Sequence, residues 1–200
     1  MEQVILSTYM SAPSVRFVGS FMGTEDLFSD DLPKIALIGR SNVGKSSLIN
    51  ALTASGISRT SALPGATKEL NVFLVNNSIH LVDLPGYGYA RGSIGFRTKM
   101  RDLIKQYLLN KKYTQAAVVL IIDAGVGMTD RDESMYADLQ DAGKNIIIAA
   151  NKIDRLSQSE YHHAMQRITA AAQGCPVFPV SAAKKTGIKE LAEALGIGGR

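Results

Sequence analysis

A glycine-bounded loop near the start of the chain has the residue types needed to bind a phosphate chain. Residues 39–46 read GRSNVGKS and match G-x-x-x-x-G-K-[ST] between a predicted strand and a predicted helix. The glycines let several backbone N–H groups point into one concavity, and the helix adds the positive end of its dipole. We expect Lys45 to reach the β- and γ-phosphates and the Ser46 hydroxyl to bind Mg²⁺. A glycine turn without a ligand is the alternative.

A second motif, NKID at 151–154, predicts which base carries those phosphates. A carboxylate at Asp154 can accept hydrogen bonds from both N1–H and the N2 amine of guanine. Adenine presents an acceptor at N1 and has no N2 amine, so it would leave the carboxylate unsatisfied. We expect Asn151 to brace the loop and the Lys152 stem to cover the base. The alternative is a helix cap that contains these residue types by chance.

The tetrapeptide DLPG at 83–86 follows another predicted strand and can sense the end of the phosphate chain. Asp83 can hold a magnesium-bound water, and the N–H of Gly86 can meet the γ-phosphate where a side chain would obstruct approach. Thr67 is the expected second hydroxyl on Mg²⁺, with Thr60 as the alternative. A D-x-x-G tetrapeptide on its own is commonly only a turn.

SAAK at 181–184 follows the last predicted strand and completes the set. A backbone N–H near Ala182 could donate to guanine O6. The same residues could simply begin a helix, and their value as a signal comes from their position after the other motifs.

The elements that must position these loops alternate between apolar strand-like runs and amphipathic helical patterns. This alternation predicts βαβ units and a mainly parallel sheet. The predicted strands are Lys34–Ile38, Leu70–Val75, Ser78–Val82, Ala116–Asp123, Asn145–Ala150 and Pro176–Val180. The predicted helices are Ser46–Ala54, Phe96–Asn110, Arg131–Ala142, Ser159–Gln173 and Ile188–Leu195. We expect residues 1–32 to be an N-terminal extension, in which Val15–Val18 could add a strand, and residues 33–200 to be one domain.

Composition narrows the class of protein further. The 200 residues are 46% hydrophobic and 20% charged, with a single cysteine, so an intramolecular disulfide scaffold and a disordered chain are excluded. Apolar runs such as 116–122 fall far short of the ~20 residues that span a bilayer, so we expect no membrane insertion. Residues 1–13 lack the pattern of a signal peptide, and we expect a cytoplasmic protein.

The net charge of +4 is unevenly distributed. Residues 91–112 hold seven Lys or Arg and only Asp102 as an acid, so this stretch carries +6 and the remainder −2. Arg97, Arg101 and Lys105 recur every fourth residue on one face of a predicted helix. That face is either an ordinary solvated surface or one that contacts phosphates.

Taken in order, GRSNVGKS, Thr67, DLPG, NKID and SAAK resemble a small Ras-like GTPase of the translation-factor class. The longer segments IGRSNVGKSSLIN and VDLPGYGYA, with SAAKKTGI near the end, are similar to the EngB family of the TrmE-Era-EngA-EngB-Septin-like class. The resemblance implies an α/β fold: a three-layer P-loop NTPase domain with a mainly parallel six-stranded sheet, one antiparallel edge strand, and helices on both faces.

The resemblance also implies a cytoplasmic GTPase, here expected to be a monomer. Its expected ligands are GTP or GDP with Mg²⁺, and its expected partner is the large ribosomal subunit, whose assembly it would serve with a link to cell division and septation. Ras-type proteins carry Gln after the D-x-x-G glycine, and this chain has Tyr87, so we expect slow intrinsic hydrolysis. Related GTPases use an Asn at the position of Asn42 to bind K⁺; the alternative is that Asn42 only stabilises its loop.

The expected nucleotide-contacting residues are therefore Gly39, Arg40, Ser41, Asn42, Val43, Gly44, Lys45, Ser46, Ser47, Gly65, Ala66, Thr67, Asp83, Leu84, Pro85, Gly86, Asn151, Lys152, Asp154, Ser181, Ala182 and Ala183. Those expected to take part in hydrolysis are Asn42, Lys45, Thr67 and Gly86, and those expected at Mg²⁺ are Ser46, Thr67 and, through a water, Asp83.

Two other functions fit some of these features. A P-loop kinase acting on a small molecule would share the phosphate motif, but it would need an acceptor site and a lid, for which no added segment is evident. A GTP-binding regulatory module at the division site, without ribosome binding, would share every motif.

Overall fold

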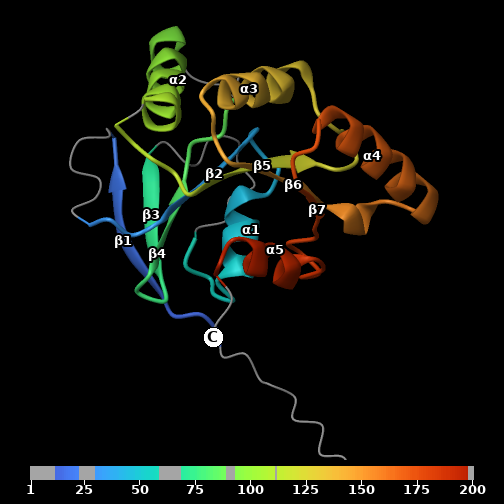
Figure 1. The fold of residues 1–200 in the computed structure, drawn as a ribbon, viewed down its shortest axis with the longest axis horizontal. Coiled ribbons are helices and arrows are strands. Elements are labelled where there is room, and N and C mark those ends of the chain that lie inside the picture. Colours follow the sequence, from blue (N-terminus) through green and yellow to red (C-terminus); the bar gives the residue numbers. More distant parts are fainter. Residues whose placement is uncertain (1–11, 23–29, 59–68, 89–92, 111, 198–200) are drawn as a thin grey trace, which may run out of the picture.

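The computed structural model describes residues 12–22, 30–58, 69–88, 93–110 and 112–197. These residues form one seven-stranded sheet between two layers of helices (Figure 1). The strands are β1 (Val15–Phe21), β2 (Lys34–Gly39), β3 (Leu70–Val75), β4 (Ile79–Asp83), β5 (Ala117–Asp123), β6 (Ile146–Asn151) and β7 (Val177–Pro179). The predicted strands from 34 to 180 are each present to within one or two residues at either end.

The strand order is β1-β3-β4-β2-β5-β6-β7. β2 pairs in parallel with β4 and β5, and β6 pairs in parallel with β5 and β7. β3 is antiparallel to both of its neighbours, β1 and β4. The sheet therefore has one strand more than the six expected, because residues from the N-terminal segment pair with β3. For the same reason the antiparallel strand lies one position in from the edge. The register of β1 shifts between Phe17 and Gly19, which marks a β-bulge.

Five α-helices cover the sheet within the described part of the chain. α2 (Ile94–Leu109), α3 (Asp130–Asp141) and α4 (Gln158–Ala171) lie over one face, and α1 (Lys45–Leu52) and α5 (Ile188–Ala194) over the other (Figure 1). A short 3₁₀ turn, Ile153–Arg155, follows β6. Among these described helices, none has the length and apolar content to cross a membrane.

The alternation of side chains along β2 shows how both faces are buried. Ala36 and Ile38 belong to the core beneath α2, α3 and α4, and Ile35 and Leu37 to the core beneath α1 and α5. Because successive side chains of a strand point to opposite faces, a strand between two helical layers must be apolar at nearly every position. This requirement explains why residues 35–38, IALI, form a continuous apolar run rather than an alternating one.

The parallel strands bring the functional loops to a common edge. β2, β4 and β6 run in the same direction, so the segments that follow Gly39, Asp83 and Asn151 all leave the sheet at its carboxyl edge. In open α/β sheets, ligands bind outside this edge. The three strongest sequence motifs therefore start within a few strand widths of one another.

The interior strand β5 should contribute strongly to the stability of the domain. Leu120 of β5 is completely buried, so Leu120→Ala should lower the free energy of unfolding by about 2–5 kcal/mol in urea denaturation, because a cavity replaces lost apolar contacts. Val126→Ala removes a half-exposed side chain and should change it by less than about 0.5 kcal/mol. Equal effects of the two substitutions would contradict the assignment of the core.

Candidate functional site

The phosphate loop, residues 39–46, turns sharply between β2 and α1. Gly44 is the N-cap of α1 and has φ of 98°, a conformation that side-chain-bearing residues rarely adopt. A Cβ at this position would lie 2.5 Å from Nδ2 of Asn151. The backbone here must therefore be glycine both for its φ angle and for its close approach to the loop after β6. This geometry gives the loop the curvature that a phosphate site requires.

Lys45 is the cation of this loop, and the fold buries it. Its side chain begins α1, only 8% of the residue is exposed, and Nζ lies 3.5 Å from the carbonyl oxygen of Gly39. Burial lowers the pKa of the Lys45 ammonium, and the nearby Asp83 carboxylate partly opposes this shift. A bound phosphate would favour the charged form and offset the cost of burying it.

Asp83, at the end of β4, is the matching buried anion. It is 1% exposed, and neither carboxylate oxygen has a hydrogen-bond partner among the described residues. Burial raises the pKa of Asp83 to about 6, with Lys45 acting in the opposite direction. The buried Ser41 hydroxyl also has no partner among those residues. Buried polar atoms without partners are costly, and these atoms lie together, which fits a site completed by a ligand.

The donor set fits Mg²⁺ held mainly by phosphate and water. Asp83 supplies carboxylate oxygens and Ser46, in the first turn of α1, supplies a hydroxyl, and Mg²⁺ prefers such oxygen donors. The described residues contain no group of three or more His, Cys, Asp or Glu side chains able to hold a metal by themselves. One or two protein ligands with substrate phosphates is the usual arrangement for Mg²⁺ in nucleotide sites.

Gly86 lies directly against the phosphate loop. A Cβ on Gly86 would be 3.0 Å from Lys45 Nζ and also 3.0 Å from the backbone nitrogen and the hydroxyl of Ser41. Any side chain there would press on the lysine and on the loop. The next residue, Tyr87, accepts a hydrogen bond from the backbone N–H of Ser41 at 3.2 Å. The DLPG segment and the phosphate loop therefore form one continuous wall.

The buried Asn151 side chain links three loops. Its Nδ2 donates to the carbonyl oxygen of Val43 at 2.8 Å, and its Oδ1 accepts from the backbone N–H of Ala182 at 3.1 Å. The expectation that Asn151 braces the loop agrees with these contacts. The Ala182 N–H, expected near guanine O6, is engaged by Asn151 in this structure.

Lys152 and Asp154 are also held in place by neighbouring groups. Lys152 Nζ donates to the carbonyl oxygen of Asn42 at 2.6 Å and pairs with Asp123 Oδ2 at 2.8 Å. The hydroxyl of the fully buried Ser181 donates to Asp154 Oδ1 at 2.5 Å. This bond orients the Asp154 carboxylate, the group that would read the base.

The structure thus brings together the four motifs that follow β2, β4, β6 and β7. Within them, Leu84 is a core residue, and the Arg40 side chain pairs with Asp132 on α3. We predicted nucleotide contacts for both residues. Their side chains serve the fold, and contacts of their backbone with the nucleotide stay a prediction. Gly65, Ala66 and Thr67, together with the alternative Thr60, lie outside the described residues.

Sequence reasoning missed two acidic residues that support the site, Asp123 and Asp132. Asp123 ends β5 and holds Lys152. Asp132 had a local signal, because Thr129-x-x-Asp132 has the spacing of a capping box, and the structure contains that box. Nothing in the local pattern indicates its contacts with residues more than forty positions away.

Fold and site together define a P-loop GTPase, a protein that binds guanine nucleotides and hydrolyses GTP. The sequence model of the family described as "50S ribosome-binding GTPase" matches residues 34–152, and that of the "Elongation factor Tu GTP binding domain" matches 110–196. The chain belongs to the EngB family within the 50S ribosome-binding GTPases, as the relatives below show.

Two relatives are each named "Probable GTP-binding protein EngB". The one from Alkaliphilus metalliredigens is 41% identical over 83% of this chain and 81% of its own length. The one from Solibacter usitatus is 40% identical over 93% of this chain and 96% of its own length. A solved structure of an Era variant from Aquifex aeolicus, bound to GDP and AlF₄⁻, superposes with a TM-score of 0.70 at 27% identity. That match covers 82% of this chain but only 56% of the Era chain.

The geometry of Asp154 leads to a prediction about base selectivity. Asp154→Asn would place an amide N–H₂ against the N2 amine of guanine, so GDP affinity should fall by roughly 100-fold or more. Xanthosine diphosphate, which carries a carbonyl at that position, should bind better to the variant than GDP does. Isothermal titration calorimetry with both nucleotides measures this reversal of the base preference.

Ser181→Ala is the matched control for that substitution. It removes only the hydroxyl that orients Asp154, so GDP should remain the preferred ligand with about a tenfold weaker affinity. If Asp154→Asn kept the wild-type preference for GDP, Asp154 would not be the residue that reads the base.

Proposed function

We propose that this chain is a slow GTPase of the cytoplasm, acting as a monomer, whose nucleotide state controls its binding to the large ribosomal subunit during assembly. The link to cell division and septation follows from the same family resemblance. The matched family description supports a ribosomal partner. The observation that carries the proposal is a cationic groove whose floor is the segment after Gly86.

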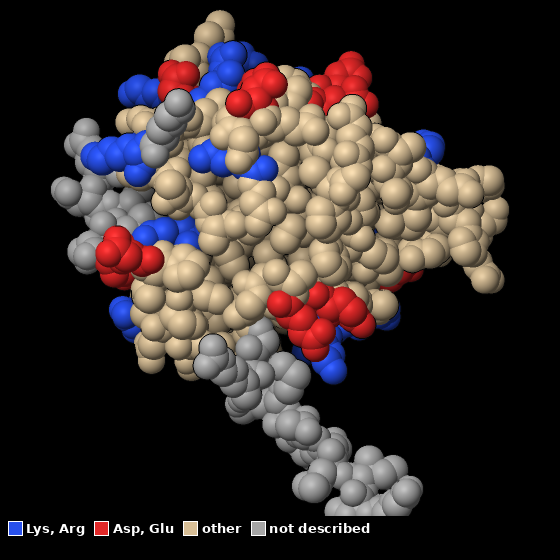
Figure 2. All heavy atoms as spheres, in the orientation of Figure 1, with Lys and Arg blue, Asp and Glu red and all other residues tan. Residues whose placement is uncertain are grey.

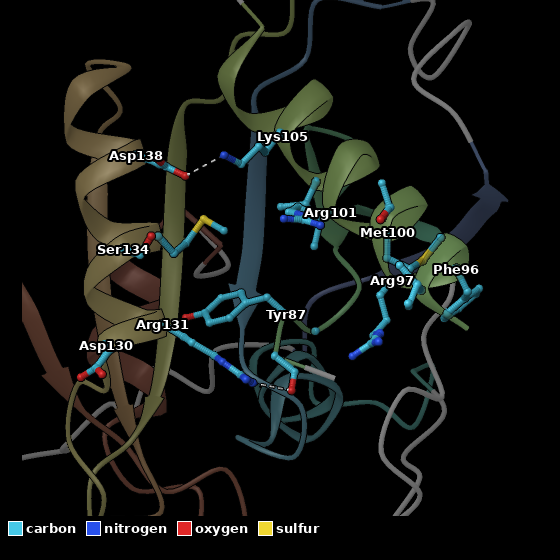
Figure 3. A pocket seen from close by; sticks show the side chains of 16 residues that line it. Tyr87, Phe96, Arg97, Met100, Arg101, Lys105, Asp130, Arg131, Ser134 and Asp138 are labelled. Carbon is cyan, nitrogen blue, oxygen red and sulfur yellow. Dashed lines mark hydrogen bonds and ion pairs between the residues drawn. The ribbon is translucent and has the colours of Figure 1, made fainter. Parts of the chain in front are cut away.

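The groove lies between α2 and α3 and encloses about 690 Å³. Arg97 and Arg101 line it from α2, Arg131 lines it from α3, and Tyr87 lies at its base (Figure 3). Lys105 is also in the groove, but its Nζ pairs with Asp138 at 3.4 Å. In Figure 2, Lys and Arg side chains gather over α2 at the top of the molecule, with some carboxylates among them. Of the three evenly spaced cations on α2, Arg97 and Arg101 are therefore the better placed for phosphate contacts.

The site geometry supports a role for each group that surrounds the phosphates of the nucleotide. Lys45 and the N–H groups of the phosphate loop bind the β- and γ-phosphates, and the Gly86 N–H binds the γ-phosphate. When bound, Mg²⁺ neutralises charge on the phosphates. Thr67, which lies outside the described residues, is proposed as the second hydroxyl ligand of Mg²⁺, beside Ser46. The roles proposed for Gly65, Ala66 and Thr67 come from the sequence alone.

Slow turnover follows from the orientation of Tyr87. Hydrolysis of GTP needs a group that orients the attacking water, and Gln does this in Ras-type proteins. The Tyr87 hydroxyl instead donates to Asp132 Oδ1 at 2.6 Å, on the side of α3 (Figure 3). We expect an intrinsic rate on the order of 10⁻⁴–10⁻³ s⁻¹, as for unassisted Ras.

A monovalent cation at Asn42 would add positive charge beside the phosphates. Asn42 stands in the phosphate loop with φ of 67°, and its residue is exposed, so its side chain can meet a cation beside the phosphates. We predict that replacing Na⁺ by K⁺ raises the single-turnover hydrolysis rate by about tenfold or more, and that Asn42→Ala abolishes the increase. The measurement is phosphate release from a pre-formed GTP complex. Equal rates in the two cations would limit Asn42 to stabilising its loop.

The ribosomal proposal is tested by sedimentation with large ribosomal subunits in GDP and in a non-hydrolysable GTP analogue. We expect co-sedimentation to depend on the nucleotide. The double variant Arg97→Glu with Arg101→Glu should weaken it, and log affinity against log salt should be shallower by about two units, because two phosphate contacts are lost.

Lys189→Glu with Arg167→Glu makes the same change in net charge on α5 and α4, away from the groove. This control should leave co-sedimentation unchanged. Unchanged binding by the α2 variant would remove the groove from the interface. No binding in either nucleotide would favour the regulatory module without a ribosomal partner.

A further inference from the structure

Asp132, near the start of α3, lies in none of the nucleotide motifs, yet the fold buries it completely. Its Oδ1 accepts from the Tyr87 hydroxyl at 2.6 Å, and its Oδ2 lies 2.9 Å from Arg40 Nε. Oδ2 also accepts from the backbone N–H and the hydroxyl of Thr129 at 2.9 and 2.7 Å. A buried carboxylate with charge-assisted bonds to several partners holds those partners in fixed positions.

The two distant partners of Asp132 belong to the two halves of the γ-phosphate site. Arg40 follows the first glycine of the phosphate loop, and Tyr87 follows Gly86. Two further contacts reinforce the same arrangement. Arg40 and Tyr87 form a parallel β-bridge, and the Arg131 guanidinium donates to the Gly88 carbonyl oxygen at 2.8 Å. Gly86 is thereby held so close to Lys45 and Ser41 that a Cβ on it would lie 3.0 Å from each of them.

The hydrogen bond from the Tyr87 hydroxyl to Asp132 should persist over the whole pH range in which the protein works. Burial, with a further contribution from the Asp132 charge, moves the pKa of the Tyr87 phenol well above its usual value. The phenol therefore stays protonated and remains a donor. Its direction, toward α3 and away from the phosphate loop, makes Tyr87 an anchor for the backbone rather than a group that touches the nucleotide (Figure 3).

We propose that Asp132 is a positioning residue for GTP recognition: through Tyr87 and Arg40 it holds Gly86 where the γ-phosphate of GTP binds. This inference rests on the proposed contact between the Gly86 N–H and the γ-phosphate. GDP lacks that phosphate, so Asp132 should contribute to the affinity for GTP and little to the affinity for GDP. A residue on α3 would thus set the selectivity between the two nucleotide states.

The test measures dissociation constants of a non-hydrolysable GTP analogue and of GDP, with Mg²⁺, for the wild type, Tyr87→Phe and Asp132→Asn. We expect each variant to lower the affinity for the GTP analogue relative to GDP by about tenfold, a typical size for coupling between sites. GDP affinity should stay within about twofold. Because both substitutions act on one link, the double variant should lose little more than either single variant.

Thr129→Ala is the matched control, since it removes a hydrogen bond to the same carboxylate without touching Tyr87 or Arg40. It weakens the cap of α3 and should leave the ratio of the two affinities unchanged. Tyr87→Phe deletes one hydroxyl only and decides the question even if Asp132→Asn fails to fold.

Two results would overturn the proposal. If the affinity ratio were unchanged in Tyr87→Phe, or if both affinities fell together, the link would stabilise the domain without positioning Gly86. If Gly86→Ala also left the affinity for the GTP analogue unchanged, the underlying contact with the γ-phosphate would be absent as well. Neither measurement involves ribosomes, so the ribosomal proposal stands or fails separately in the sedimentation experiment.

Discussion

The arrangement of the site depends on the buried side-chain amide of Asn151. Three loops that follow three different strands have no covalent connection near the site, and this amide joins them through one donated and one accepted hydrogen bond. Its position is in turn fixed because β6 is a fully buried strand, paired on both sides with β5 and β7. The distance between the phosphate loop and the base-reading loop is therefore set by the parallel sheet, and Gly44 leaves room for the amide to reach across.

The site also contains buried charged and polar groups whose burial is unfavourable until a ligand interacts with them. Lys45 and Asp83 are buried, and the orphaned oxygens of Asp83 and Ser41 lie beside them. Functional sites commonly carry such unfavourable features, and the rest of the fold compensates for them. A ligand that binds only the folded state stabilises it in proportion to its concentration and affinity. The nucleotide is thus expected to contribute to the stability of the protein that binds it.

Much of the fold and site could be predicted from the sequence because the decisive signals are local. The phosphate loop needs its glycines and lysine at fixed spacing, and buried strands need continuous apolar residues, so both are visible in a short window. The supporting contacts are not local. Asp132 meets residues 92 and 45 positions away, and its spacing from Thr129 indicates only a helix cap. For β1 the sequence indicates only that a strand is possible. Whether it forms depends on pairing with β3, which lies about fifty residues further along the chain.

The two outer strands of the sheet have a consequence for how the protein behaves at high concentration. β7 has only three residues, follows Pro176 and ends at Pro179, and a proline offers no N–H to a neighbouring chain. β1 carries Arg16 and a bulge that interrupts its regular register. Short, proline-bounded or irregular edges are poor templates for strand addition by another molecule. We therefore expect the β7 edge to resist edge-to-edge aggregation, while at β1 only the bulge and Arg16 oppose strand addition.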